Sequence, residues 1–128
     1  MSVVSAVLAD DHAVYRHSLE RAFARDPRLE VLAAVTDGAA ALRAVEHLKP
    51  DVVLLDLQMP QLTGVEVAQC LLARGIFVPT LLITAADADA REIAAEAPSV
   101  LAVLSKSLSR AVIADALVRV ALQPPRES

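Results

Sequence analysis

The 128-residue chain has very few aromatic residues and a single cysteine. Two phenylalanines, one tyrosine and no tryptophan leave alanine, valine, leucine and isoleucine to build the core, although 55% of the chain is hydrophobic. Such a core suits helices packed on a sheet. The lone Cys70 excludes an internal disulfide and a zinc site made of several thiolates, which is typical of a reducing compartment. We expect it to pack as a small apolar residue.

The sequence also lacks an excess of basic residues and any long apolar run. Its net charge of −4 and pI near 5.3 argue against direct nucleic-acid binding by this segment, because such binding usually needs a basic face. No apolar run approaches the roughly 20 residues that span a bilayer. The first residues also lack the basic segment of a signal peptide. We therefore expect a cytoplasmic protein that makes no membrane contact.

The strongest pattern that is present lies in residues 50–60. This apolar run is short, rich in branched residues and bounded by Pro50 and Pro60, which predicts a buried central strand. Asp56 stands where the strand ends. In an open parallel sheet, ligands bind at the carboxyl ends of the strands, so Asp56 is placed where chemistry is usually found.

Other predicted strands also end in polar side chains. They are residues 3–9 before Asp10 and Asp11, residues 80–84 ending in Thr84, and residues 100–104 before Ser105 and Lys106. If all these strands are parallel, three acids, a hydroxyl and an amine meet at one edge of the sheet. Close carboxylates repel one another unless a cation lies among them. The pocket is therefore expected to hold a hard cation beside the ammonium group of Lys106.

Helical patterns separate the strands, so strand and helix alternate five times. The predicted helices cover residues 13–25, 38–49, 64–74 and 87–97 and a last segment capped by Ser107 or Ser109, and the remaining strand covers residues 29–35. This order predicts one α/β domain, a doubly wound five-stranded parallel sheet with five helices on its two faces. Val14, Leu48 and Val112 are expected on the buried sides of the first, second and last helices. Ile93 is the one large apolar anchor of the fourth helix.

Taken together, these residues resemble the receiver domain of two-component response regulators. The matching motifs follow the family's order and spacing over essentially the whole chain: Asp10-Asp11, Asp56-x-x-Met59-Pro60-x-x-x-Gly64, Thr84-Ala85 and Lys106. Residues 8–19, which read LADDHAVYRHSL, are similar to the subfamily with a downstream LuxR/NarL-type helix-turn-helix output domain. The resemblance implies a flavodoxin-like sheet of strand order 2-1-3-4-5, with a receiver over residues 1–122. Residues 123–128 would be a tail or the start of a linker.

The resemblance also implies a phosphoryl acceptor and a magnesium site. Asp56 would accept a phosphoryl group from a histidine kinase, so the protein would assist its own phosphorylation and dephosphorylation without being an enzyme in the usual sense. Mg²⁺ would be bound by Asp11, Asp56 and the backbone carbonyl of Gln58, and by Asp10 largely through water. His12 is expected to be a solvated residue at a helix start, and no histidine is assigned to the metal.

The implied switch departs from the family pattern. Thr84 would donate its hydroxyl to a phosphoryl oxygen, and Lys106 would pair first with the carboxylate and then with the phosphate. The family usually couples Thr84 to an aromatic residue three positions before the lysine, where this chain has Val103. This departure bears on the output mechanism more than on phosphoryl acceptance. The face formed by the fourth helix, fifth strand and fifth helix is the family's common dimer and output surface, so a homodimer is expected there.

Three other interpretations stay open from the sequence. A constitutive interaction module of receiver shape would have little use for the intact cluster of acids and lysine. A hydrolase with an aspartyl-phosphate intermediate commonly needs a second acid two residues after the nucleophile, where this chain has Gln58. A flavin-binding protein of the same strand order is disfavoured because no Ser/Thr/Gly-rich phosphate loop follows the first strand.

Overall fold

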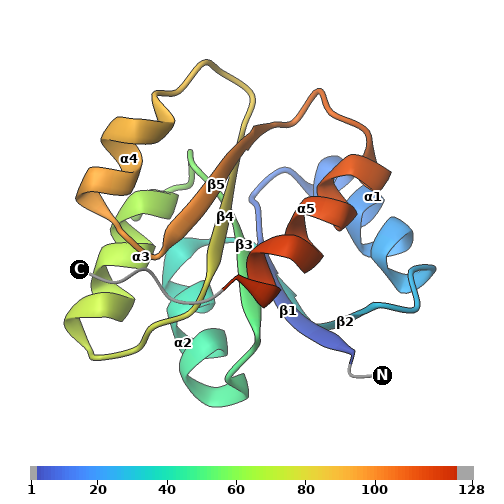
Figure 1. The fold of residues 1–128 in the computed structure, drawn as a ribbon, viewed down its shortest axis with the longest axis horizontal. Coiled ribbons are helices and arrows are strands. Elements are labelled where there is room, and N and C mark those ends of the chain that lie inside the picture. The colour runs from blue at the N-terminus through green and yellow to red at the C-terminus, as the bar shows by residue number, and fades with distance from the viewer. Residues whose placement is uncertain (1–2, 124–128) are drawn as a thin grey trace.

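The computed structural model describes residues 3–123, in which five strands and five helices alternate (Figure 1). The elements are β1 Val4–Ala9, α1 Ala13–Ala24, β2 Leu29–Val35, α2 Gly38–Leu48, β3 Val52–Asp56, α3 Gly64–Ala73, β4 Thr80–Thr84, α4 Ala90–Glu96, β5 Val100–Ser105 and α5 Arg110–Leu122. The strands form one parallel sheet of order β2-β1-β3-β4-β5. The predicted doubly wound fold and strand order are confirmed.

The sheet separates two apolar layers. Helices α1 and α5 pack on one face, and α2, α3 and α4 lie on the other (Figure 1). Successive side chains of β3 point into opposite layers: Leu54 faces α1 and α5, whereas Val53 and Leu55 face α2 and α3. Phe23 is the only aromatic side chain buried among the described residues. The core is therefore aliphatic, as the composition predicts, and each buried leucine or valine contributes about 1.5–3 kcal/mol.

Side-chain caps fix where the helices begin. Asp37 accepts a hydrogen bond from the backbone N–H of Ala40 at the start of α2. Thr63 and Glu66 form a reciprocal capping box at the start of α3. Ser109, one of the two predicted caps, accepts from the N–H of Val112. Each cap satisfies a backbone donor that the first helical turn leaves free, a contribution of about 1 kcal/mol.

Three apolar residues do not face the core as predicted. Val14 is 85% exposed, and Leu48 and Val112 are each 44% exposed. Leu48 is the last residue of α2 and Val112 lies in the first turn of α5, where a helix extends past the layer it covers. In α1 the buried stripe instead runs through Leu19 and Phe23, and it begins with the partly buried Tyr15. Val14 therefore points outward because its neighbour Tyr15 occupies the inward direction.

The fourth helix is short and lightly held. Each residue of α4 is at least partly exposed, and Ile93 packs against the core only partly buried. No helix within residues 3–123 is both long enough and apolar enough to cross a membrane. The expected tail, residues 123–128, lies outside the described residues except for Gln123, which follows α5.

Candidate functional site: an acidic pocket at the carboxyl edge of the sheet

The strand register brings the predicted site residues to one edge of the sheet. Ala9 of β1 is paired with Leu55 of β3, so Asp10 follows β1 beside Asp56 at the end of β3. Asp56 in turn is paired with Ile83, which puts Thr84 one residue further along β4. The remaining partner, Lys106, directly follows β5. Parallel pairing thus gathers side chains that are almost 100 residues apart in sequence, because every strand ends at the same edge.

The ammonium group of Lys106 bridges two buried carboxylates. Its Nζ lies 2.8 Å from Oδ2 of Asp10 and 3.0 Å from Oδ2 of Asp56. Asp10 and Asp56 are 0% and 1% exposed. The backbone N–H of Lys106 donates to the carbonyl oxygen of Thr84, which anchors the residue where β5 ends. Bringing two carboxylates this close is unfavourable without a cation, so this lysine is a structural requirement of the pocket.

Burial and charge act in opposite directions on the ionisable groups. Burial raises the pKa of Asp56 above its ordinary value, and hydrogen bonds from Lys106 and from the backbone N–H of Gln58 oppose this only in part; the nearby charge of Asp10 raises it further. For Lys106, burial lowers the pKa, but its close pairing with the carboxylates of Asp10 and Asp56 outweighs burial and leaves the pKa raised. The lysine therefore stays charged at neutral pH. With Asp11 beside them, the three acids retain an excess of negative charge that attracts a further cation.

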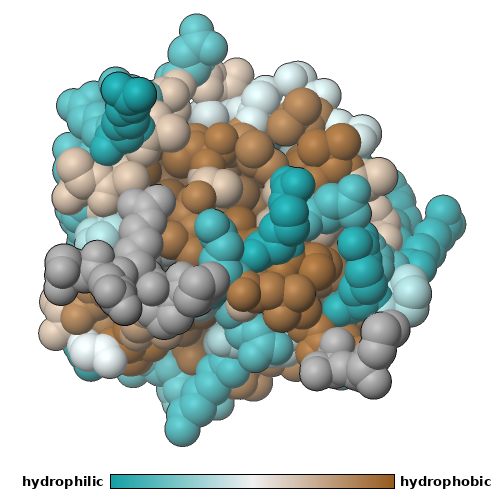
Figure 2. Space-filling view, in the orientation of Figure 1, coloured by the Kyte–Doolittle hydropathy of each residue, from teal (hydrophilic) through white to brown (hydrophobic). Residues whose placement is uncertain are grey.

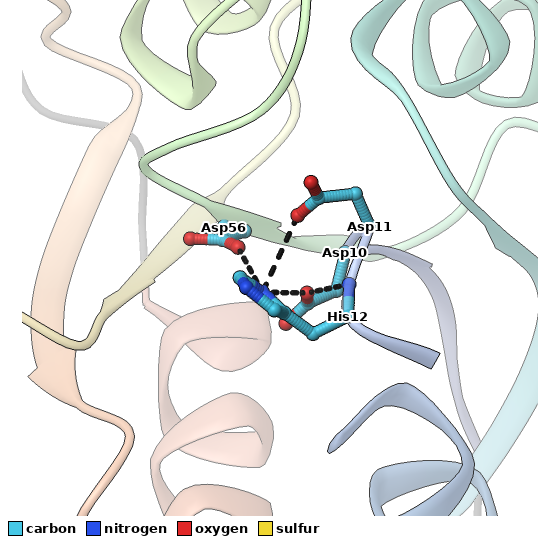
Figure 3. A group of neighbouring side chains, drawn as sticks. All are labelled: Asp10, Asp11, His12 and Asp56. Atoms are coloured by element: carbon cyan, nitrogen blue, oxygen red, sulfur yellow. Dashed lines mark hydrogen bonds and ion pairs between the residues drawn. The ribbon is translucent and has the colours of Figure 1, made fainter. Parts of the chain in front are cut away.

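The donor atoms of the pocket suit a divalent cation. One ligand atom from each of Asp10, Asp11, His12 and Asp56 can be chosen so that all four lie within 4.8 Å of one another (Figure 3). Oδ2 of Asp10 is buried without a well-aligned hydrogen bond among the described residues, although the Lys106 ammonium lies 2.8 Å away. Carboxylate oxygens are the ligands that Mg²⁺ prefers. The residues present thus fit a magnesium ion, as the sequence led us to expect.

His12 belongs to this pocket although sequence reasoning set it aside. Its side chain is 65% exposed, as a helix-start residue should be, yet Nδ1 lies 3.3 Å from Oδ1 of both Asp10 and Asp11 and 3.6 Å from Oδ2 of Asp56 (Figure 3). The backbone N–H of His12 donates to Oδ1 of Asp10 and holds the turn. The expected solvated histidine at a helix start is what the structure shows; the contacts of its ring with the acids were not expected, and they arise because this turn directs the ring back over them.

Two further residues support the end of α1 nearest the pocket. Arg16 donates from Nη1 to the carbonyl oxygen of Asp10 at 2.8 Å. The Tyr15 ring lies beneath Lys106, with Nζ 4.7 Å from the ring centroid. Sequence reasoning missed both roles. The available signal for Tyr15 was spacing: it precedes Leu19 by four residues, so the two share one side of the helix.

The loops beyond β3 and β4 are held close to the acceptor position. The Gly64 N–H donates to the carbonyl of Leu57, and a Cβ added at Gly64 would lie 2.7 Å from the backbone oxygen of Asp56. A glycine is needed there because any side chain would push against the end of β3. Thr84 is 3% exposed, and its Oγ1 accepts from the N–H of Ala86. That bond leaves the hydroxyl proton of Thr84 available to another acceptor.

Comparisons with known proteins point to one family. Residues 6–118 match the response regulator receiver domain. Over 84 residues the chain is 44% identical to a response regulatory protein of Vibrio cholerae, and over 84 residues it is 37% identical to the transcriptional regulatory protein DegU of Brevibacillus brevis. These alignments cover 65% and 66% of this chain but 32% and 36% of the relatives, so it spans about a third of their length.

A solved structure extends the likeness to the whole fold. The signal receiver domain of the response regulator NarL from Mycobacterium tuberculosis superposes with a TM-score of 0.87 at 31% sequence identity. The superposition covers 97% of this chain and 100% of that one. The resemblance drawn from the sequence is thereby confirmed, and the acidic pocket lies where its motifs predict. This chain belongs to the receiver domains of response regulators.

Proposed function

We propose that Asp56 accepts a phosphoryl group from a histidine kinase in a magnesium-dependent reaction, and that the resulting acyl phosphate controls a transcriptional output. The observation that carries this proposal is the Asp56 carboxylate, buried at the carboxyl edge of the sheet and paired with Lys106. The likeness to DegU and NarL supports a transcriptional output. We assign the receiver to residues 1–122, with residues 123–128 as a tail or the start of a linker.

Besides Mg²⁺ and the phosphohistidine of the kinase, the transfer uses only groups that the pocket supplies. A carboxylate oxygen of Asp56 attacks phosphorus while the bond to the phosphohistidine nitrogen breaks, and the imidazole departs with that electron pair. The products are an acyl phosphate on Asp56 and a histidine that regains a proton. Lys106 then has phosphoryl oxygens to pair with, and the Thr84 hydroxyl can donate to another of them. The phosphoryl group replaces one negative charge by up to two, so it draws both residues toward it.

Magnesium would be held by the acids around the acceptor. Asp11, Asp56 and the backbone carbonyl of Gln58 would bind it directly, with Asp10 acting largely through water. The bound ion supplies positive charge that offsets the phosphoryl oxygens. Lys106, with its Nζ 2.8 and 3.0 Å from Asp10 and Asp56, balances only part of the negative charge of these acids. A pocket with this excess of negative charge should therefore bind Mg²⁺ before it takes up phosphoryl.

The α4–β5–α5 face offers a surface for a second copy of the chain. In the described sheet β5 lies at an edge, and Leu101, Ala102, Val103 and Leu104 are partly exposed along it. Two hollows of about 500 and 440 Å³ flank the strand, one toward α4 and one toward α5. Figure 2 shows hydrophobic residues gathered over this side of the molecule. We place the homodimer on this face, with any DNA contact in a downstream domain and the protein in the cytoplasm.

The intact mass of the protein after incubation with Mg²⁺ and acetyl phosphate tests this function. We expect one phosphoryl group on the wild type and none on Asp56→Asn or after chelation of the metal. Glu30→Gln is the matched control, because it also converts a carboxylate to an amide but lies exposed on β2. It should be labelled like the wild type. A wild type that takes up no phosphoryl group would refute the proposal and favour a constitutive interaction module.

A further inference from the structure

We propose that Tyr15 is a positioning residue, which holds Lys106 against the acids and couples its movement to Arg110 at the start of α5. The inference rests on the proposed function, since Lys106 moves when Asp56 carries a phosphoryl group. Tyr15 lies in the first turn of α1, and its ring contacts two cations at once. Lys106 Nζ lies 4.7 Å and Arg110 Cζ 4.4 Å from the ring centroid. Both distances fall within the range of cation–π attraction.

Arg110 connects this ring to the rest of the α1–α5 layer. Its Nε donates to Oγ of Ser18 in α1 at 2.8 Å. As the first residue of α5, it places a cation at the positive end of a helix dipole, which is unfavourable in isolation. The Tyr15 ring and the Ser18 hydroxyl offset that cost. Arg110 is therefore held where it is by α1, and a movement of the ring must disturb the junction between α1 and α5.

The Tyr15 hydroxyl is buried and has no hydrogen-bond partner among the described residues. Leaving such a group unsatisfied costs folding free energy, whereas phenylalanine would fill the same space without that cost. Burial raises the pKa of this phenol, although the charges of Arg110 and Lys106 oppose the rise, so the hydroxyl keeps its proton. The ring face, not the hydroxyl, therefore makes the contact with the two cations.

The two arrangements follow from the charges. Without phosphoryl, the Lys106 ammonium lies between Asp10, Asp56 and the ring. A phosphoryl group on Asp56 moves the negative charge outward, so Nζ follows it and leaves the ring face. The ring then keeps only Arg110 as a cationic neighbour. Val103, at the position where the family usually has its aromatic switch residue, packs instead in the α2–α3 layer. Tyr15 thus supplies a ring beside Lys106 on the opposite face of the sheet.

The composition makes this contact measurable, because Tyr15 is the single tyrosine and the chain has no tryptophan. Tyrosine emission should change when acetyl phosphate and Mg²⁺ are added to the wild type, in step with the increase in mass. A control moves the reporter by combining Tyr15→Phe with Phe77→Tyr, since Phe77 is 43% exposed and lies after α3, away from the pocket. This variant should gain the same mass without the change in emission. Unchanged wild-type emission at full phosphorylation would overturn the proposal.

Rate measurements separate positioning from simple packing. Tyr15→Leu should speed phosphorylation by about 2- to 30-fold, because it removes one cation–π contact that exists before phosphorylation and is lost after it. Tyr15→Phe keeps the ring and should stay near the wild-type rate. Circular dichroism confirms that each variant is folded. A Tyr15→Leu variant that is folded and as fast as the wild type would contradict the role.

A comparison without any phosphodonor distinguishes failure of this inference from failure of the proposed function. The emission of Tyr15 in Lys106→Met should already differ from that in the wild type, because the ammonium has left the ring. In Lys49→Met, which removes an exposed lysine, the emission should be unchanged. If the wild type takes up no phosphoryl group but Lys106→Met alters the emission, the acceptor role fails and the contact stands. Identical emission in all three proteins would refute the contact itself.

Discussion

Replacing Lys106 by methionine removes the ammonium that lies between two buried carboxylates. Asp10 and Asp56 are 0% and 1% exposed, and the Lys106 side chain is 12% exposed. Removal of one partner from a buried ion pair costs about 3–5 kcal/mol, and we expect the lower end, about 3 kcal/mol, because the pocket opens to solvent on the Asp11 side. For a domain of this size that corresponds to a fall in Tm of about 10 °C.

The stability that Lys106→Met loses should be larger at neutral pH than at acidic pH. Burial and the charge of Asp10 already raise the pKa of Asp56, and the bond to Lys106 opposes them. Without that bond the folded-state pKa rises further above the unfolded value. Between the unfolded-state pKa and the higher folded-state pKa, Asp56 is protonated in the folded variant but ionised in the unfolded chain. The stability of the variant therefore falls as pH rises through this range. We therefore expect the variant to differ most from the wild type at neutral pH and to approach it as pH falls toward about 4.

Thermal unfolding followed by circular dichroism measures both effects. Mg²⁺ should stabilise Lys106→Met more than the wild type, because the ion no longer competes with the ammonium and binds only the folded pocket. Adding Asp56→Asn to Lys106→Met should restore much of the lost stability by removing one of the two carboxylates. Lys49→Met, at an exposed position after α2, is the control and should have the same Tm as the wild type. A Tm equal to that of the wild type at neutral pH would refute this account of the pocket.

Three further predictions follow from the geometry of the site and its supports. Gly64→Ala should lose about 1–3 kcal/mol of stability, measured by chemical denaturation, and should be phosphorylated more slowly, because its Cβ would lie 2.7 Å from the Asp56 carbonyl oxygen. Gly75→Ala is the control: it is strained at φ +75 but has open space around it, so it should lose stability and keep its phosphorylation rate. His12→Ala should weaken Mn²⁺ and Zn²⁺ binding in calorimetry more than Mg²⁺ binding, since imidazole favours transition metals. Asp37→Ala should cost about 1 kcal/mol by removing a cap and leave phosphorylation unchanged.

The fold and the positions of the acids could be predicted because they depend on local pattern and on a general rule of parallel sheets. Residues 50–60 indicate a buried strand from their own composition, and Asp56 ends that strand in the structure. The alternation of strands and helices then requires a parallel sheet, which brings Lys106 to the same edge. Neither step depends on how individual side chains pack. The assignment of phosphoryl acceptance to Asp56 stays a prediction.

The contacts made by α1 could not be predicted in the same way. Val14 and Tyr15 are adjacent, and helical periodicity alone does not show which of them faces the core. The docking of α1 against α5 decides that Tyr15 turns inward. The same docking brings Arg110 within 4.4 Å of the ring centroid. The contacts of the His12 ring with the acids could not be predicted either, because the ring direction depends on the turn held by Asp10. Such details arise from tertiary packing, and a periodic sequence pattern does not contain them.

The chemical identity of the phosphorylated residue tests the central claim. An acyl phosphate is reduced by borohydride to an alcohol, whereas a phosphohistidine is not, so the reduction distinguishes Asp56 from the neighbouring His12. After phosphorylation with acetyl phosphate and Mg²⁺, reduction and peptide mass analysis should find homoserine at position 56 and an unmodified aspartate at positions 10 and 11. Phosphate retained on His12, homoserine at another aspartate, or no modification at all would contradict the account.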